Sequence, residues 1–502
     1  MERSKICLTL TGSTLEEDIA LVNKYRDKID IVELRCDYLD RSEQLAVRKF
    51  PGLVGVPTIL TIRRKCDGGL YDGGESGRTI IFSKALAMAS PDPKNNFAYI
   101  DFEEDYHVSS LQDAALAFGT KIIRSYHDME KPVTGLAKRM EELSRNNFEI
   151  PKIAFMPKTL DDVTQLFREA KNLKDNNHIL IAMGPLGLPS RILSTKLGNY
   201  LTYCSAEETI HNTNGIFHIT PNELNDLYHF KKIDENTKIF GITGWPLTHT
   251  SSPQIHNAGY EKTGLNAVYI PVKAEKIREA LTFANEVGIE GLSVTVPHKE
   301  NLLTYVADQD ETVRDIGASN TIVKKDEHWR AYNTDAPGFE RSLLEFIGKK
   351  NLRGKKVAVI GAGGAAKAVC YAVKHLKGKA CVFNRTVTKA KSLADKYGFK
   401  FAPLNTTSSQ LLQKYSDIII QTTSIGMNAT LPVTAENDPL YFYDFNGHES
   451  VIDIVYTPAT TPLMVHAQQA GCRTLNGFNM LKYQGYLQFK HFTGISLEGE
   501  TK

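Results

Sequence analysis

The sequence predicts an α/β protein: an N-terminal (β/α)8 TIM barrel, followed by a two-lobed α/β unit that contains a Rossmann domain. Two observations carry this prediction. Eight short apolar runs alternate with helical patterns between residues 5 and 230, as the repeating unit of a barrel requires. Further on, the apolar run Val357–Ile360 leads directly into a glycine-rich turn and a helical segment. A doubly wound sheet is the alternative for the first half.

The chain as a whole has the composition of a globular protein. Its 502 residues suffice for two or three domains, and 42% are hydrophobic while 24% are charged. A net charge of only +2 gives no support for a nucleic-acid-binding surface. The seven cysteines are scattered and never spaced CxxC, which argues against a disulfide framework or a zinc site and fits a reducing compartment. With neither a signal peptide nor a membrane-spanning run evident, we expect a cytoplasmic protein without a metal, nucleic-acid or membrane partner. The oligomeric state is left open.

The eight predicted strands of the barrel are short and mostly apolar. In chain order they are Ile6–Leu10, Ile31–Asp37, Thr58–Arg64, Ala98–Glu103, Lys121–Asp128, Lys152–Met156, Ile179–Met183 and Leu201–Cys204. Helical patterns lie between most of them. In the segment Thr14–Asp27, for example, Thr14 and Glu17 have the spacing of a capping box.

Several of these strands carry ionisable residues on one face. Successive side chains of a strand point to opposite faces, so Glu33, Arg35 and Asp37 share a face. The same alternation pairs Thr61 with Arg63, Asp101 with Glu103, Ser125 with His127, and Lys152 with Ala154 and Met156. Charges inside a barrel are costly unless they pair or bind something. They form either structural salt bridges or a site for an acidic, hydroxylated substrate at the barrel mouth.

The segments VELRCD, TIRR, SYHD and IPKIAFMP resemble type I 3-dehydroquinate dehydratases, over most of residues 5–230. This resemblance implies that Lys152 forms a Schiff base with the substrate ketone and that His127 transfers protons as base and acid. An iminium withdraws electrons from the neighbouring C–H bond, so a mild base can remove that proton. The lysine must be neutral to attack, and burial near other cations favours the neutral form.

The same resemblance implies the residues that bind the substrate. Arg191, in GLPSRILS, matches the arginine that binds the carboxylate. The remaining implied contacts are Thr9, Glu33, Arg35, Arg63 and Ser205. Two positions depart from the family pattern: Asp67 stands where a glutamate is usual, and the loop S-A-P-G-Q reads Ser205-Ala206-Glu207-Glu208-Thr209. Ser205 therefore matches the pattern, but the family glutamine is missing.

The glycine-rich turn after Ile360 has the pattern of a dinucleotide-binding site. Gly361 permits the tight turn, Gly363 lets a pyrophosphate approach the backbone, and Ala366 fits the third position of the pattern, in a helix expected to begin near Ala365. We expect residues Gly361, Ala362, Gly363, Gly364 and Ala365 to contact the cofactor. The next strand ends in Asn384-Arg385-Thr386, where NAD enzymes place an acid. A cation there suits a 2′-phosphate, so the predicted cofactor is NADP(H).

The second half resembles shikimate dehydrogenases across residues 238–492. The motifs that carry this resemblance are His249-Thr250-Ser251-Ser252-Pro253, SVTVPHK, ASNT, YNTD, the glycine-rich turn with NRT, and NGFNMLKYQ. It implies that Lys299 donates the proton in ketone reduction and that Asp335 orients it. It further implies substrate contacts at Thr250, Ser252, Thr295, Asn320, Tyr456 and Gln484, and cofactor contacts at Ile454 and Gly477. Position 250 is usually serine.

Together the two resemblances predict a bifunctional enzyme of the shikimate pathway that dehydrates 3-dehydroquinate and then reduces 3-dehydroshikimate with NADPH. The expected domains are the dehydratase barrel at 1–231, the substrate domain at 238–348 with 475–502, and the NADP-binding Rossmann domain at 349–474. Two alternatives remain: a ligand-sensing regulator that keeps these folds without catalysis, and a quinate dehydrogenase in the second half. The regulator predicts loss of Lys152, Lys299 or Asp335, and all three are present.

Overall fold

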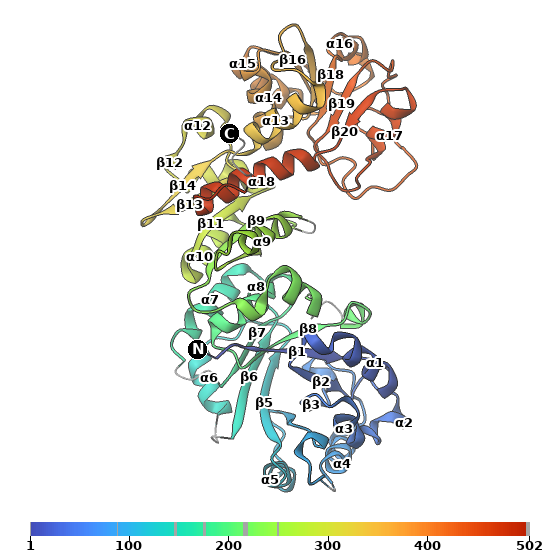
Figure 1. The fold of residues 1–502 in the computed structure, drawn as a ribbon, viewed down its shortest axis with the longest axis vertical. Coiled ribbons are helices and arrows are strands. Elements are labelled where there is room, and N and C mark those ends of the chain that lie inside the picture. Colours follow the sequence, from blue (N-terminus) through green and yellow to red (C-terminus); the bar gives the residue numbers. More distant parts are fainter. Residues whose placement is uncertain are drawn as a thin grey trace. The chain divides into compact units, whose positions relative to one another are not determined.

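The computed structural model describes residues 2–87, 89–144, 148–173, 177–213, 219–247 and 250–497. The chain divides into two compact units, residues 1–289 and 290–502. Figure 1 shows the chain coloured along the sequence, and each unit is taken here by itself.

The first unit begins with eight parallel strands that follow one another around a barrel. Their order in the sheet is β7-β6-β5-β4-β3-β2-β1-β8. The two ends of this order meet through a bridge between His178 and Asn199 and a hydrogen bond of 2.7 Å from Tyr200 N to His178 O. The strands are β1 (Lys5–Leu10), β2 (Ile31–Arg35), β3 (Thr58–Thr61), β4 (Tyr99–Glu103), β5 (Lys121–Asp128), β6 (Glu149–Phe155), β7 (Ile179–Ala182) and β8 (Leu201–Ser205). The predicted barrel is therefore confirmed.

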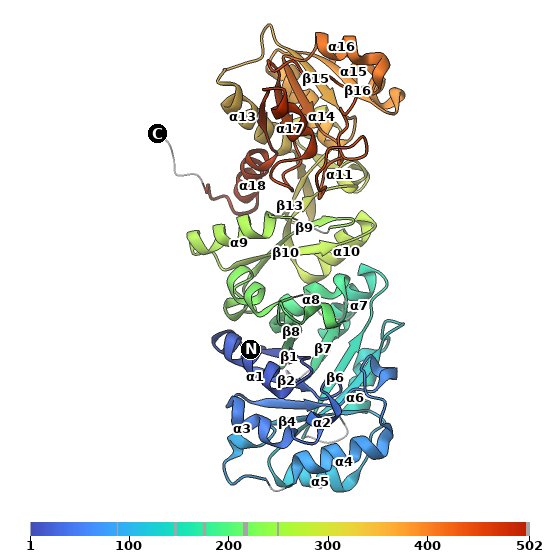
Figure 2. The ribbon, with the colours of Figure 1, turned by 90° about the vertical axis from the view of Figure 1, so that its right-hand side faces the viewer.

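Helices cover the outside of these strands in both ribbon views (Figures 1 and 2). They are α1 (Leu15–Tyr25), α2 (Arg41–Gln44), α3 (Phe50–Val54), α4 (Gly74–Leu86), α5 (Ser109–Ala117), α6 (Leu136–Leu143), α7 (Leu160–Ala170) and α8 (Leu188–Ile192). The predicted capping box is present, because Thr14 accepts from the backbone of Glu17 and the Glu17 carboxylate accepts in return.

The inside of the barrel is layered by the two-residue alternation of its strands. One layer is apolar and consists mainly of Ile31, Ile59, Tyr99, Ile123, Ile150, Ile179 and Leu201. Two residues further along the same strands stand polar side chains such as Glu33, Asp101 and Lys152, each at most 5% exposed. The apolar layer thus closes one end of the barrel, and the charged layer lies toward the carboxyl ends of the strands, where barrel enzymes carry their active sites.

The first unit continues beyond the barrel with two parallel strands and two helices: β9 (Lys238–Gly244), α9 (Ser252–Thr263), β10 (Ala267–Lys273) and α10 (Ile277–Val287). Helix α10 packs on barrel helix α7. The rings of Phe167 and Phe283 meet edge to face at 5.5 Å, and Arg168 pairs with Glu286 at 2.8 Å. This contact ties the start of the second predicted domain to the barrel.

The second unit opens with a mostly antiparallel group of strands and its helices. These elements are β11 (Ile289–Val294), α11 (His298–Asn301), β12 (Asp308–Gln309), α12 (Glu311–Ile316), β13 (Thr321–Lys325), β14 (His328–Tyr332), α13 (Asp335–Ile347) and, from the end of the chain, α18 (Phe478–Thr493). The hairpin β13–β14 turns through Asp326, whose φ is +51°. Helix α18 lies alongside α13 (Figure 1).

A parallel six-stranded sheet in the order β17-β16-β15-β18-β19-β20 forms the rest of this unit. Its elements are β15 (Lys356–Ile360), α14 (Gly364–His375), β16 (Lys379–Asn384), α15 (Val387–Tyr397), β17 (Lys400–Pro403), α16 (Ser409–Lys414), β18 (Ile418–Gln421), β19 (Ser450–Asp453), α17 (Pro462–Gln469) and β20 (Arg473–Leu475). Alternate strand residues belong to two cores, one under α14 and α15 and one under α16 and α17. This is the predicted Rossmann sheet, and its strand order reverses between β15 and β18.

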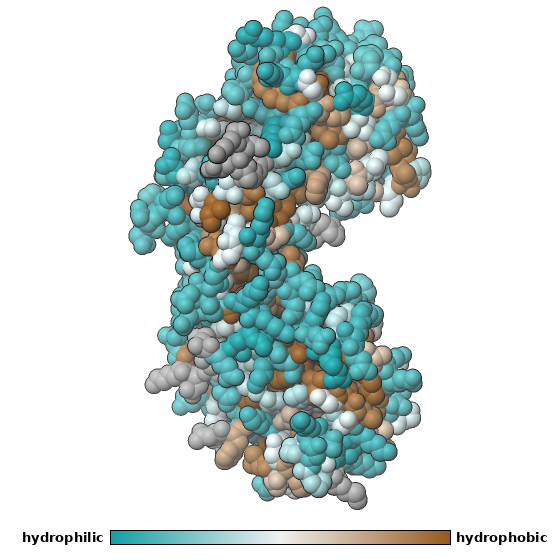
Figure 3. Space-filling view, in the orientation of Figure 1, coloured by the Kyte–Doolittle hydropathy of each residue, from teal (hydrophilic) through white to brown (hydrophobic). Residues whose placement is uncertain are grey.

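The face of the molecule seen in Figure 3 is mostly hydrophilic. Among the described residues, no helix is both long and apolar enough to cross a membrane.

Candidate active sites

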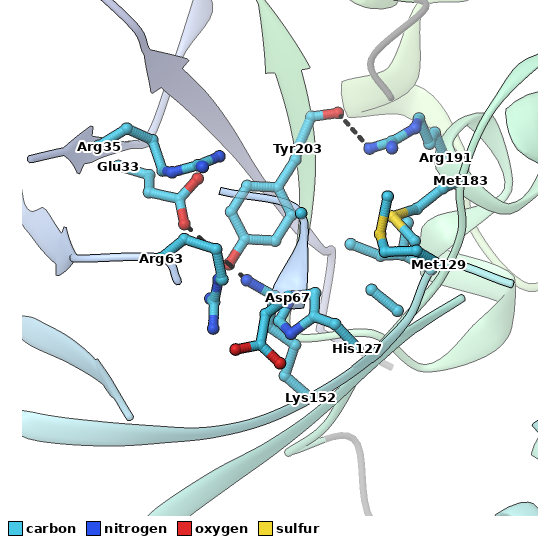
Figure 4. A pocket seen from close by; sticks show the side chains of 13 residues that line it. Glu33, Arg35, Arg63, Asp67, His127, Met129, Lys152, Met183, Arg191 and Tyr203 are labelled. Atoms are coloured by element: carbon cyan, nitrogen blue, oxygen red, sulfur yellow. Dashed lines mark hydrogen bonds and ion pairs between the residues drawn. The ribbon is translucent and has the colours of Figure 1, made fainter. Parts of the chain in front are cut away.

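A cavity opens within the charged layer of the barrel (Figure 4). It is lined by Glu33, Arg35, Arg63, Asp67, Gly68, His127, Met129, Lys152, Ala154, Ile181, Met183, Arg191 and Tyr203. These residues come from strands β2, β5, β6, β7 and β8, from helix α8 and from the connections after β3, β5 and β7. The fold thus brings together most of the residues that the first resemblance implies.

Lys152 lies deep in this cavity, on β6. Its Nζ donates to Asp101 Oδ2 at 3.0 Å and lies 3.8 Å from Glu33 Oε1. The same nitrogen stands over the ring of Tyr203, 4.5 Å from the centroid. The charged groups in direct contact with Lys152 are therefore carboxylates. The cations that were expected near it line the same cavity and are Arg35, Arg63 and Arg191. The amine needs a base to take its proton before it can attack a carbonyl.

Arg63 anchors the network of ion pairs below the cavity. Its guanidinium lies 2.8 Å from both Asp101 and Glu103 and donates to Ser125 Oγ at 3.0 Å. Burial alone would raise the pKa of Asp101, but Arg63 and Lys152 hold that pKa well below its usual range. Both interpretations of the charged layer thus have support: some of its residues form structural salt bridges, while others line a cavity.

Thr9 and Ser205 differ from the other predicted contacts because neither lines the cavity. The Thr9 hydroxyl donates to Glu33 Oε2 at 3.0 Å, while Thr61 donates to the other oxygen of Glu33 at 2.8 Å. Ser205 pairs with Thr9 across β8 and β1 and is fully buried. Thr9 therefore orients Glu33, and Ser205 lies next to Thr9 on the neighbouring strand. Part of the loop that should cover the substrate, residues 214–218, lies outside the described residues.

His127 lies at the carboxyl end of β5 and faces the cavity. Burial lowers its pKa well below the usual value, and the positive charges of Arg63 and Lys152 lower it further. Its Nδ1 is buried and has no hydrogen-bond partner among the described residues. The imidazole is therefore neutral near pH 7 and can accept a proton.

Arg191 presents a cation to the same cavity from helix α8. The residue is 1% exposed, and its Nη1 donates to the carbonyl oxygen of Tyr203 at 3.2 Å. Burial lowers the pKa of Arg191 to about 10. A bound carboxylate would compensate for this loss of solvation.

Sequence reasoning missed part of this cavity. Asp101 was placed on the right face but given no role, although it contacts both Lys152 and Arg63. Tyr203, Met129 and Met183 were not singled out at all. The alternation of β8 could have found Tyr203, because it stands between the inward-facing Leu201 and Ser205.

The second unit holds an ion pair between Lys299 and Asp335, with 2.5 Å between Nζ and Oδ2. Asp335 begins helix α13, where the helix dipole favours a carboxylate. The side-chain amide of Asn320 donates to Asp335 Oδ1 at 3.0 Å, to Gln484 Oε1 at 3.1 Å and to the Thr334 hydroxyl at 2.9 Å. Four predicted residues from separate motifs thus meet in one network. Sequence reasoning missed Thr334.

Close packing of two helices sets the position of Gln484. A Cβ atom on Gly338 of α13 would lie 2.8 Å from the backbone nitrogen of Gln484 on α18. Thr295 follows β11 and accepts from His298 N at 2.9 Å through its carbonyl. Thr250 and Ser252 lie at the start of α9 in the first unit, where the Thr250 hydroxyl donates to Ser252 Oγ at 3.2 Å.

The glycine-rich turn connects β15 to α14 in the manner the sequence predicts. Gly361 has φ +115°, and a Cβ there would lie 2.5 Å from the Thr422 hydroxyl. A Cβ on Gly363 would meet open space, while one on Gly364 would lie 3.4 Å from Lys299 Cβ. The turn therefore passes directly beside Lys299. Ala362 and Ala365 are half-buried within it.

The other predicted cofactor residues lie at the carboxyl ends of β16 and β19. Asn384 donates to Thr386 O at 2.9 Å, while Arg385 and Thr386 are exposed. Gly477 approaches the carbonyl of Ile454 so closely that a Cβ would lie 1.9 Å from it. Tyr456 is half-buried nearby in sequence. A tight turn at a helix N-terminus with an exposed arginine on the next strand fits a dinucleotide that carries a 2′-phosphate.

No group of three or more potential ligands that could hold a metal ion occurs among the residues that the structure describes.

Comparison with known proteins covers both units. The family model for type I 3-dehydroquinase matches residues 6–235. The models for the shikimate dehydrogenase substrate binding domain and for shikimate/quinate 5-dehydrogenase match residues 242–322 and 343–436. The shikimate dehydrogenase (NADP(+)) of Shouchella clausii is 38% identical over 51% of this chain and 94% of its own length. That of Caldanaerobacter subterraneus is 38% identical over 52% and 94%.

The similarity to known proteins extends across both halves of the chain. The chloroplastic bifunctional 3-dehydroquinate dehydratase/shikimate dehydrogenase of Arabidopsis thaliana is 30% identical over 98% of this chain and 82% of its own length. The chain therefore belongs to the family of bifunctional 3-dehydroquinate dehydratase/shikimate dehydrogenases.

Proposed function

We propose that the barrel dehydrates 3-dehydroquinate to 3-dehydroshikimate and that the second unit reduces 3-dehydroshikimate to shikimate with NADPH. The observation that carries the proposal is the cavity in which Lys152, a neutral imidazole and a buried arginine converge. These three groups are what Schiff-base dehydration of a hydroxylated keto acid requires: a nucleophile, a base and a counter-ion.

In the barrel, Lys152 attacks the ketone after losing its proton, and water leaves to give an iminium. The neutral His127 then removes a proton from the carbon next to the iminium, whose electron demand makes that proton acidic. The protonated His127 returns the proton to the departing hydroxyl group. Asp101 keeps its negative charge throughout, because Arg63 and Lys152 lower its pKa. It stabilises the positive charge that the lysine nitrogen carries as ammonium and as iminium.

Substrate binding in the barrel follows from the charges that line the cavity. We assign the substrate carboxylate to Arg191, whose burial lowers its pKa to about 10 and so favours an anionic partner. Glu33, Arg35 and Arg63 are the proposed contacts of the hydroxyl groups. Asp67 lines the cavity where the family has a glutamate, and it pairs with Arg64 at 2.6 Å. Thr9 and Ser205 act on the substrate only through Glu33 and its surroundings.

In the second unit, Lys299 donates a proton to the ketone oxygen and Asp335 holds the ammonium in place. The contact of 2.5 Å between them supports a single catalytic unit. Asn320 and Gln484 present amide groups to the substrate hydroxyls. Gly361, Gly363 and Gly364 would hold the pyrophosphate of NADP(H) and Arg385 its 2′-phosphate, and the bound cofactor supplies the hydride. Because Gly364 packs on Lys299, the turn and the proton donor are positioned together.

The remaining assignments rest on the resemblance. They are the substrate contacts Thr250, Ser252, Thr295 and Tyr456, the cofactor contacts Ile454 and Gly477, and the domain limits 1–231, 238–348 with 475–502, and 349–474. We also propose a cytoplasmic location, which the seven free cysteines support.

The proposed function is tested by incubating the purified protein with 3-dehydroquinate and NADPH. We expect absorbance of the enone to rise and then fall as the nicotinamide absorbance falls, because the product of the first step is the substrate of the second. Enone that accumulates without NADPH consumption would contradict the second activity. Shikimate and quinate offered separately with NADP decide between shikimate and quinate dehydrogenase.

A further inference from the structure

The phenol of Tyr203 is buried in the barrel cavity without a partner. The residue is 2% exposed, lies on β8 and lines the cavity with Lys152 and Arg191. Its hydroxyl oxygen has no hydrogen-bond partner among the described residues. Figure 4 shows the side chain pointing into the middle of the group of catalytic candidates. A buried hydroxyl of this kind is unusual, because nearly all buried polar side-chain atoms are hydrogen-bonded.

Packing accounts for the ring of Tyr203 but not for its oxygen. The ring packs against apolar side chains of the barrel interior and faces the ammonium of Lys152. A phenylalanine would provide both interactions without burying an unpaired hydroxyl, which costs free energy. Within the part of the chain that the structure describes, the oxygen has no partner, and it lies at the cavity, where a ligand could supply one.

The backbone at Tyr203 is held from two sides. The backbone of Tyr203 pairs with Cys7 across β1 and β8, and its carbonyl accepts from Arg191 Nη1 at 3.2 Å. These contacts hold the backbone, and the packed ring keeps the hydroxyl at the cavity. Burial raises the pKa of this phenol well above its usual value, and the carboxylate of Glu33 raises it further. The hydroxyl keeps its proton at neutral pH and acts as a donor.

We infer that Tyr203 contacts the substrate of the dehydratase by donating a hydrogen bond to the oxygen of the ketone that Lys152 attacks. The inference rests on the proposed Schiff-base function. Nζ lies over the ring, 4.5 Å from its centroid. A ketone carbon within bonding distance of Nζ carries its oxygen one bond further on, within the part of the cavity that the ring borders.

This contact assists the formation of the Schiff base. As the bond from Nζ to carbon forms, the π bond of the carbonyl breaks and negative charge develops on the oxygen. The hydrogen bond from Tyr203 stabilises that charge. Of the three protons of the Lys152 ammonium, one stays on the iminium nitrogen and two leave with the oxygen as water, partly by way of His127. Tyr203 itself gives up no proton in the net reaction. In the reverse sense, the same hydroxyl can hydrogen-bond to the oxygen of the water that later hydrolyses the product iminium.

The test is the variant Tyr203→Phe, which removes the oxygen and leaves the ring. We expect kcat/KM for dehydration to fall roughly 10–100-fold, the range for a lost hydrogen bond to a buried ligand oxygen. The borohydride-trappable adduct on Lys152 should form more slowly by the same factor. The midpoint of thermal unfolding should stay or rise, because an unpaired buried hydroxyl has been removed.

The matched control is Tyr99→Phe, which removes a phenol oxygen from the same barrel interior but at its apolar end. Tyr99 shares a hydrogen bond with Tyr200. This variant should unfold at a lower temperature and keep its dehydratase activity, the opposite of the result for Tyr203→Phe.

Failure of this inference is distinguishable from failure of the proposed function. If the unmodified protein does not dehydrate 3-dehydroquinate, the function itself is wrong. If it does, and Tyr203→Phe forms the adduct at the unmodified rate, the contact with the ketone oxygen is wrong. A lowered unfolding midpoint in Tyr203→Phe would also overturn it, since the hydroxyl would then have a partner within the protein.

Discussion

The two candidate sites are built by different means. In the barrel, the functional side chains stand on neighbouring strands and belong to a continuous buried network in which Arg63, Asp101 and Lys152 are each at most 5% exposed. In the second unit, a single ion pair between Lys299 and Asp335 is assembled at the ends of two helices. The first site is fixed by the regular geometry of a sheet, whereas the second depends on loops and helix ends.

This difference predicts how each site responds to mutation. A buried network leaves an unpaired charge behind when one member is removed, which typically costs about 3–5 kcal/mol. Lys152 is protected from this effect, since Asp101 keeps Arg63 as a partner 2.8 Å away. Removal of Lys152 should therefore abolish activity without unfolding the barrel, whereas removal of Arg63 should destabilise it. In the second unit, removal of Lys299 or Asp335 should lower the rate by the contribution of one positioned proton transfer.

The largest expected effect is that of Lys152→Ala. Without the nucleophile, dehydration of 3-dehydroquinate should fall by roughly 10⁴-fold or more, while NADPH-dependent reduction of added 3-dehydroshikimate stays unchanged. Lys121→Ala is the matched control, because Lys121 is an exposed lysine at the start of the neighbouring strand. Loss of both activities in Lys152→Ala would break the comparison, since the two sites would then depend on one another.

The next effect concerns the pair in the second unit. Lys299→Ala and Asp335→Asn should each lower the turnover of shikimate oxidation by roughly 10²–10⁴-fold. The double variant should lose far less than the product of the two losses, because members of one catalytic unit are not additive. Dehydratase activity serves as the internal control. Losses that multiply would mean that the two residues act separately.

A smaller effect is expected at the cofactor site. Arg385→Ala should raise KM for NADP roughly 10–100-fold, since a charge-assisted bond to the 2′-phosphate is lost. KM for NAD should change little. Arg353→Ala provides the control, because Arg353 is another exposed arginine of the second unit. Equal changes for both cofactors would show that Arg385 does not read the phosphate.

The smallest effect is a displacement of a pH profile. Burial, Arg63 and Lys152 all lower the pKa of His127, so the base stays neutral in the folded enzyme at pH values where a free histidine is protonated. The acid limb of kcat/KM for dehydration should lie below pH ~6.5. Measurement of kcat/KM between about pH 5 and 8 checks this. A midpoint at or above the ordinary histidine value would contradict an imidazole whose pKa is lowered by its surroundings.

The fold was largely predictable because its strands have clear periodicity. All eight barrel runs and the strand before the glycine-rich turn are confirmed. Strand β14 was missed although Trp329 and Ala331 alternate with more polar residues, because a run of five residues with two charged or titratable members is a weak signal. The strand is held between β13 and β12 in the sheet. Short charged strands form only because a neighbour offers backbone hydrogen bonds, which a single segment of sequence does not reveal.

The sites were predictable to the extent that strand alternation or a motif marks a residue. Alternation placed Glu33, Arg35, Arg63, His127 and Lys152 toward one interior, and the structure places all five around one cavity. Alternation does not say how far along the barrel a side chain stands. For that reason alternation did not show that Thr9 contacts Glu33, that Ser205 pairs with Thr9, or that neither of them lines the cavity. The depth of each side chain in the barrel depends on how β1 and β8, which are distant in sequence, pair with each other.

The most direct test of the whole account is borohydride reduction in the presence of 3-dehydroquinate, followed by peptide mapping. We expect one covalent adduct, on Lys152 in the barrel, with Lys299 unmodified although it too lies beside a carboxylate. An adduct on Lys299 or on another lysine, or the absence of any adduct from an active enzyme, would contradict the assignment of Schiff-base chemistry to the barrel and of proton donation to the second unit.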